Sequence, residues 1–142
     1  QAICHICPYV LGDIMDEITT NISWVAIIVG AVLAFIAGWL WYSPILFGKK
    51  WAEGSGVELN DASSMPMGAM AAQIIGLIIV AWFVAAMAAQ NLLLTTILAV
   101  IGFTILQWSG NSFSGKSSYA KLVDAGYWLV SVIIMIAVQA VL

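Results

Sequence analysis

The chain has 142 residues, of which 63% are hydrophobic and only 8% are charged. A typical soluble domain has roughly 25% charged residues, so this composition excludes an ordinary water-soluble domain and predicts a chain that lies mostly within lipid. The net charge is -3, with four lysines and no arginine, so nucleic acid is not an expected partner.

Residues 1–21 are predicted to form an N-terminal tail. Met15 opens a short polar segment that runs directly into the first apolar stretch. Because Gln1 is not an initiator, the chain is expected to be processed, a fragment, or extended upstream of its true start, and Met15 would be a natural beginning if the residues before it are not native.

The tail contains the only cysteine motif, Cys4-His5-Ile6-Cys7. Two residues between cysteines are typical of a redox dithiol or of half a zinc site. A structural zinc site needs four ligands, and the fourth would have to come from Asp13 or from another subunit. We favour a motif without a function, present as a disulfide, a free pair or a translation artefact. Accordingly, we expect neither a metal nor a cofactor.

The first membrane span is predicted over about residues 22–42. A helix of about 21 residues is roughly 31 Å long, which is enough to cross a hydrocarbon core of about 30 Å. Within it, Gly30, Ala34 and Gly38 recur at every fourth position. Small residues at this spacing allow a second helix to approach closely. We favour packing within the bundle over a dedicated dimer interface.

Next comes a short helix, predicted over about residues 44–53, with Ser43 as its N-cap and Pro44 as its first residue. Its mixture of apolar, aromatic and lysine side chains is typical of a helix that lies flat at a membrane surface. Aromatic rings favour the headgroup layer, and lysines reach its charged side. The predicted interface residues are Trp39, Trp41, Tyr42, Phe47, Lys49, Lys50 and Trp51.

Three further spans are predicted over about residues 66–89, 92–108 and 122–142, so residues 22–142 form one four-helix transmembrane domain. The second span carries another row of small residues, Gly68, Ala72 and Gly76, which we expect to pack against a neighbouring helix. The fold class is therefore an all-α membrane protein with four transmembrane helices and a short interfacial helix.

The lysines predict the orientation of these spans. Lys49 and Lys50 lie in the first long connection, and Lys116 and Lys121 lie in the second. Because cytoplasmic loops carry an excess of lysine and arginine, we expect both long connections to be cytoplasmic. Both termini would then lie outside, in a multi-pass protein of the cell inner (plasma) membrane.

Two blocks of the sequence carry a resemblance to a known family. They are Gly38 to Trp51, Gly-Trp-Leu-Trp-Tyr-Ser-Pro-Ile-Leu-Phe-Gly-Lys-Lys-Trp, and Asp124-Ala-Gly-Tyr-Trp-Leu. The chain resembles, over roughly residues 22–142, the small bacterial integral membrane proteins catalogued as domain of unknown function 1761. The resemblance implies a four-span fold, and it implies no catalytic residue because the family has no assigned activity.

No phosphate-binding loop, metal cluster or activated nucleophile is recognisable in the sequence, so we do not expect an enzyme. The topology gathers a polar set at the cytoplasmic ends of the spans: Lys49, Gln73, Gln107, Ser109, Asn111, Lys116 and Asp124. Asp124 is expected at the start of the fourth span, where a helix dipole favours a carboxylate. We favour a cap or a lysine partner over a substrate or proton site for Asp124, and interhelical contact over ligand binding for Gln73.

Two functions remain open. The preferred hypothesis is a homo-oligomeric membrane protein that binds or transports a small solute or ion, with Gln73, Gln107, Asp124 and Lys49 as candidate ligand residues. The alternative is a non-catalytic accessory or scaffold subunit that packs against another membrane protein or lipid. A thiol redox role for Cys4 and Cys7 requires that the residues before Met15 exist in the native protein.

Overall fold

The computed structural model describes residues 7–59 and 66–142, and the regular secondary structure of this part of the chain is all helix, without strands. Four of its helices are long and apolar enough to cross a membrane: α2 (Trp24–Trp41), α4 (Met67–Ala89), α5 (Leu93–Phe113) and α6 (Ser118–Val141). The predicted all-α, four-span fold is therefore confirmed, and the chain is a multi-pass membrane protein.

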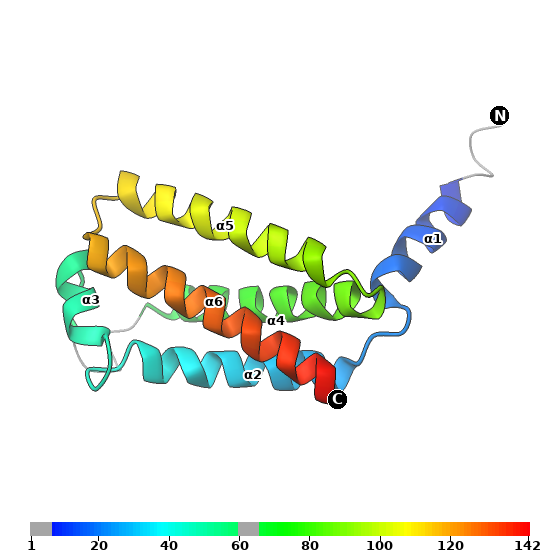
Figure 1. Cartoon of the computed structure of the whole chain (residues 1–142), viewed down its shortest axis with the longest axis horizontal. Coiled ribbons are helices and arrows are strands. Elements are labelled where there is room, and N and C mark those ends of the chain that lie inside the picture. Colours follow the sequence, from blue (N-terminus) through cyan, green and yellow to red (C-terminus); the bar gives the residue numbers. More distant parts are fainter. Residues whose placement is uncertain (1–6, 60–65) are drawn as a thin grey trace.

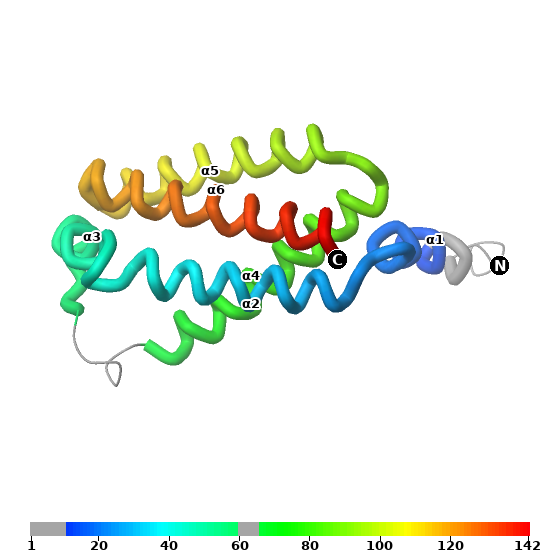
Figure 2. Tube along the Cα trace, turned by 60° about the horizontal axis from the view of Figure 1, so that its bottom comes forward, coloured from blue at the N-terminus to red at the C-terminus, as the bar shows by residue number. Residues whose placement is uncertain are grey.

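The four long helices run side by side, with the short helix α3 (Gly48–Ser55) across one end of the bundle (Figure 1). Helix α6 is central, since it contacts α2, α3, α4 and α5. Helix α4 crosses the others obliquely, and its N-terminal half diverges from them (Figure 2).

The small residues of α2 bring it close to α6. Gly30, Ala34 and Gly38 are all buried. A Cβ added at Gly30 would be 3.5 Å from Met135, an ordinary contact, whereas one added at Gly38 would be only 2.7 Å from the hydroxyl oxygen of Tyr127. Only a glycine fits at position 38 without a shift of the tyrosine ring, so this row serves packing inside the bundle.

The small-residue row of α4 behaves differently. Gly68, Ala72 and Gly76 are exposed, and a Cβ added at Gly68 or Gly76 meets no described residue within 4 Å. The expectation that this row packs against a neighbouring helix is not met within the described part of the chain. The reason is the oblique course of α4: its N-terminal half diverges from the other helices, so its buried residues begin only at Leu77 (Figure 2).

The chain after α2 differs from the predicted interfacial helix of residues 44–53. Helix α3 begins at Gly48, because residues 43–47 form turns that close the end of α2. Ser43 does not act as an N-cap: its hydroxyl donates a 2.7 Å hydrogen bond to the carbonyl oxygen of Leu40. A Cβ at Gly48 would collide with the carbonyl oxygen of Tyr42. The helix ends at Ser55, and Gly56, whose φ of 68° is left-handed, is its C-cap.

Helix α1 (Cys7–Thr19) projects away from the opposite end of the bundle (Figure 1). Its C-terminal end is attached to α4, where the indole of Trp82 donates a 2.7 Å hydrogen bond to the carbonyl oxygen of Ile18. The predicted Cys4–Cys7 motif lies outside the described part: Cys4 is not described, and neither is the side chain of Cys7.

The connection between α5 and α6 is shorter than predicted. Helix α5 extends to Phe113 rather than to about residue 108, and α6 begins at Ser118 rather than at about residue 122. The side chain of Ser117 caps α6 by accepting a 3.2 Å hydrogen bond from the amide of Ala120. Asp124 therefore lies in the second turn of α6 rather than in its first turn, as was expected from a fourth span that starts at about residue 122.

Candidate functional site

Asp124 is buried, with 5% of its surface exposed, and both of its carboxylate oxygens are bound. One oxygen accepts hydrogen bonds from the Tyr42 hydroxyl (2.9 Å) and the Trp51 indole (2.7 Å). The other accepts from the Asn111 amide (3.0 Å) and the Lys116 ammonium (2.7 Å). We call these five residues the Asp124 cluster. A carboxylate offers about four acceptor sites, so this one is fully satisfied.

Each donor comes from a different segment of the chain. Tyr42 caps the end of α2, Trp51 lies in α3, Asn111 is in the last turn of α5, and Lys116 is in the connection to α6. Gly115, with a φ of 74°, turns the chain back after α5 so that the next residue, Lys116, faces α6. The cluster therefore joins one end of the bundle around a single carboxylate.

Lys116 is the only cation among the four donors. Its ammonium lies 2.7 Å from the carboxylate and 5.7 Å from the centre of the Trp51 ring, a cation–π distance. Its side chain is 24% exposed, against 7% for Asp124. A buried carboxylate is costly unless its charge is paired, so the charge balance of the cluster depends on this one partly exposed residue.

Tyr42 follows the last residue of the α2 span and remains a hydrogen-bond donor. Its burial, and then the charge of Asp124, raise the pKa of its phenol above the ordinary value. Its ring also packs edge-on against Trp51 (centroids 4.8 Å apart) and Tyr127 (5.3 Å). The hydroxyl is therefore neutral and aimed at Asp124 throughout the physiological pH range.

A second polar contact lies deeper in the bundle, at Tyr127. Its hydroxyl donates a 3.2 Å hydrogen bond to the carbonyl oxygen of Ala34 and accepts one of 3.1 Å from the Gln73 amide. Gln73 therefore joins α4 to α6, as expected of an interhelical contact. It is connected to the Asp124 cluster through Tyr127, whose ring packs against the ring of Tyr42.

The remaining candidate ligand residues do not join the cluster. Gln107 and Lys49 are exposed, and neither donates a hydrogen bond to Asp124. Among the residues that the structure describes, no three histidine, cysteine, aspartate or glutamate side chains are grouped so that they could hold a metal ion.

Several predicted interface residues instead turn their polar atoms toward α6. The Trp41 indole donates a 3.0 Å hydrogen bond to the carbonyl oxygen of Val123, and Tyr42 and Trp51 bind Asp124. Trp39, by contrast, is 77% exposed. Sequence reasoning missed Tyr42 and Trp51 as site residues, because an aromatic residue beside lysines is equally typical of the headgroup layer.

Of the three comparisons with known proteins, one gives a match. The model of a family described as "Protein of unknown function (DUF1761)" matches residues 25–140. No curated protein and no solved structure matches the chain.

Proposed function

The chain belongs to the DUF1761 family, whose function is unknown, and we propose that it binds or transports a small monovalent cation at the Asp124 cluster. The observation that supports this proposal is a buried carboxylate that, among the described residues, has one charged partner, the partly exposed Lys116. An ionisable residue within a membrane protein is by default a candidate for solute or ion binding. We propose no enzymatic activity.

The charge balance of the Asp124 cluster favours a cation. Tyr42, Trp51 and Asn111 donate to Asp124 as neutral groups. If the ammonium of Lys116 moved away, the cluster would keep one uncompensated negative charge. A single monovalent cation would neutralise this charge. The Trp51 ring beside the ammonium also favours a cation at this position. Lys116 thus acts as an internal competitor for the cation.

The test uses Lys116→Gln, which removes the competitor and leaves the carboxylate. A ligand that binds only the folded state raises the melting temperature with its concentration. We expect the purified variant to melt at higher temperature in potassium or sodium chloride than in choline chloride of equal ionic strength. The double variant Lys116→Gln/Asp124→Asn is the control and should lose the difference. A melting temperature of Lys116→Gln that is independent of the cation would contradict the proposal.

Transport, as distinct from binding, requires a flux measurement. In liposomes that contain the reconstituted protein, we expect cation uptake that is faster than in empty liposomes and is lost in Asp124→Asn. Asp16→Asn, which alters an exposed acid of α1, is the matched control. Equal uptake by the wild type and Asp124→Asn would limit the role of the cluster to binding or stability.

For the topology, we propose that the end of the bundle formed by α3 and the α5–α6 connection is cytoplasmic and that both termini lie outside. All four lysines of the chain belong to this end, which the positive-inside rule assigns to the cytoplasm. A membrane-impermeant amine reagent should therefore label Lys49 and Lys50 in inside-out vesicles and not in intact cells. Labelling of these lysines in intact cells would invert the topology.

A second candidate, an accessory subunit or a homo-oligomer, is favoured by the exposed row of Gly68, Ala72 and Gly76. Small residues on a lipid-facing surface allow close contact with another helix. Crosslinking in native membranes followed by purification separates the possibilities, because a homo-oligomer gives multiples of one mass and an accessory subunit gives a second protein. Gly76→Leu should abolish either product, and an unchanged product would exclude this row as the contact.

A further inference from the structure

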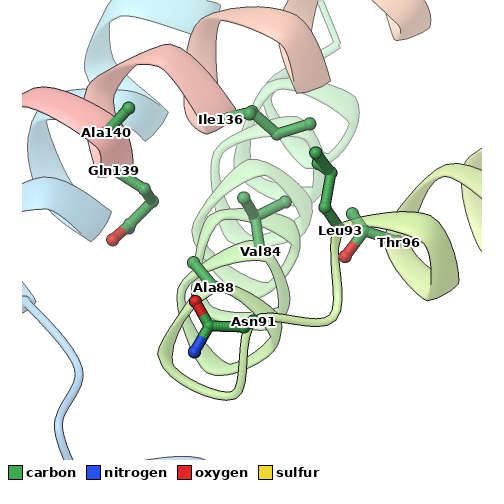
Figure 3. A pocket seen from close by; sticks show the side chains of 8 residues that line it. All are labelled: Val84, Ala88, Asn91, Leu93, Thr96, Ile136, Gln139 and Ala140. Carbon is green, nitrogen blue, oxygen red and sulfur yellow. The ribbon is translucent and has the colours of Figure 1, made fainter.

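A pocket of about 310 Å³ lies at the end of the bundle opposite the Asp124 cluster, where the α4–α5 hairpin meets the C-terminal end of α6 (Figure 3). Volumes of a few hundred cubic ångströms are typical of small-molecule sites that combine apolar walls with a few polar groups. The residues that line it are Val84, Ala88, Asn91, Leu93, Thr96, Ile136, Gln139 and Ala140.

The chemistry of the lining selects an uncharged ligand. None of the eight lining side chains carries a charge, so a charged ligand would lose its hydration without gaining a counter-charge. Val84, Leu93 and Ile136 provide an apolar wall. A ligand with an apolar body therefore fits better than an ion or a sugar.

Two amides provide the polar contact. In the view of Figure 3, Asn91 and Gln139 lie to one side of Val84, and Leu93 and Ile136 lie to the other. Among the described residues, the side-chain amides of Asn91 and Gln139 have no hydrogen-bond partner, whereas the Thr96 hydroxyl already donates to the carbonyl oxygen of Leu92 at 3.0 Å. The two amides can therefore donate to, or accept from, a hydroxyl or ester group.

From this arrangement we propose that the pocket binds an uncharged amphiphile, with its apolar part against Val84, Leu93 and Ile136 and its hydroxyl or ester on the amides of Asn91 and Gln139. A volume of about 310 Å³ holds roughly ten non-hydrogen atoms, taking about 30 Å³ for each as for water. The occupant is then either a free medium-chain alcohol or the glycerol-ester end of a neutral lipid, which share this chemistry.

The experiment uses the full chain in phosphatidylcholine bilayers and a photoreactive diazirine analogue of 1-octanol. We expect saturable labelling of residues 84–96 and 136–140, reduced at least tenfold by excess 1-octanol and unchanged by octylammonium or octanoate. Competition by monooctanoylglycerol at lower concentration than 1-octanol identifies the lipid-derived ligand, and the reverse order identifies the free alcohol. Non-saturable labelling spread over all four spans, or equal competition by octylammonium, would overturn the proposal.

Three variants keep the test specific. Ala140→Phe fills the pocket from an exposed position and should abolish saturable labelling, whereas Ala137→Phe, at an exposed neighbouring position that does not line the pocket, should leave it intact. Asn91→Gly removes one amide and retains the left-handed turn, since Asn91 has a φ of 56°. It should weaken competition by 1-octanol several-fold without changing the melting temperature. Equal loss of labelling in Ala137→Phe and Ala140→Phe would refute the site.

Discussion

Trp51 and Asp124 are 73 positions apart in the sequence, and the indole of Trp51 donates a hydrogen bond of 2.7 Å to the Asp124 carboxylate. This bond attaches α3 to the central helix α6. The backbone makes a second attachment, because the amide of Ser117 donates a 2.9 Å hydrogen bond to the carbonyl oxygen of Gly54. The position of α3 across the bundle end is therefore set by α6 as well as by the turns after α2.

Trp51→Phe tests the indole bond while retaining an aromatic ring. Hydrogen bonds to charged groups contribute about 1.5–3 kcal/mol, so we expect the free energy of unfolding to fall by about that amount. Trp39→Phe, at a side chain that is 77% exposed, should change it by less than about 0.5 kcal/mol. Thermal or denaturant unfolding in detergent measures both, and similar losses in the two variants would show that the bond is not stabilising.

Asp124→Asn should be the most damaging single change at this end of the molecule. It removes the charge that pairs with Lys116 and places an amide group beside donors. We expect a loss of roughly 2–4 kcal/mol in the free energy of unfolding, together with greater protease sensitivity of α3. Asp16→Asn is the matched control. If Asp124→Asn were as stable as the wild type, the Asp124 cluster would have no structural role.

Gly38→Ala and Gly76→Ala make a second matched pair. The added methyl at position 38 would meet the Tyr127 hydroxyl at 2.7 Å, whereas at position 76 it meets no described residue within 4 Å. Overpacking of this kind costs about 1–3 kcal/mol, so Gly38→Ala should lower the melting temperature. Gly76→Ala should have a neutral or slightly stabilising effect, because alanine is the better helix former by about 1 kcal/mol. The opposite order would contradict the close approach of α2 and α6.

The raised pKa of Tyr42 predicts that the free energy of unfolding depends on pH in the alkaline range. Burial, and then Asp124, raise the pKa of its phenol above the ordinary value in the folded state, so the folded state holds the proton more tightly than the unfolded state. The resulting stabilisation is fully present below the unfolded pKa of about 10 and is lost as the pH rises above it. The melting-temperature difference between the wild type and Tyr42→Phe should thus be constant from pH 7 to 9. The melting-temperature difference should narrow between pH 10 and 11.5. A difference that stays constant from pH 7 to 11.5 would contradict a raised pKa of Tyr42 in the folded state.

The candidate site was predictable only in part. The sequence identified Asp124 as the most informative acid and considered a lysine partner for it, and Lys116 lies 2.7 Å from its carboxylate. It did not identify Trp51 or Tyr42, because these residues also fit a membrane surface. The sequence places Gln107 and Lys49 at the same end of the spans, but this position does not specify the side of the helix on which they lie.

The sequence by itself determined the number of spans, their helical type and the end at which the lysines gather. These properties depend on the length and hydropathy of single segments, and the backbone of each segment must satisfy its own hydrogen bonds within lipid. Only the tertiary structure decided which faces meet. A span that is apolar on all sides carries no periodicity that distinguishes its inner face, so the rotation of α2, the oblique course of α4 and the convergence of four donors on Asp124 depend on how the helices pack together.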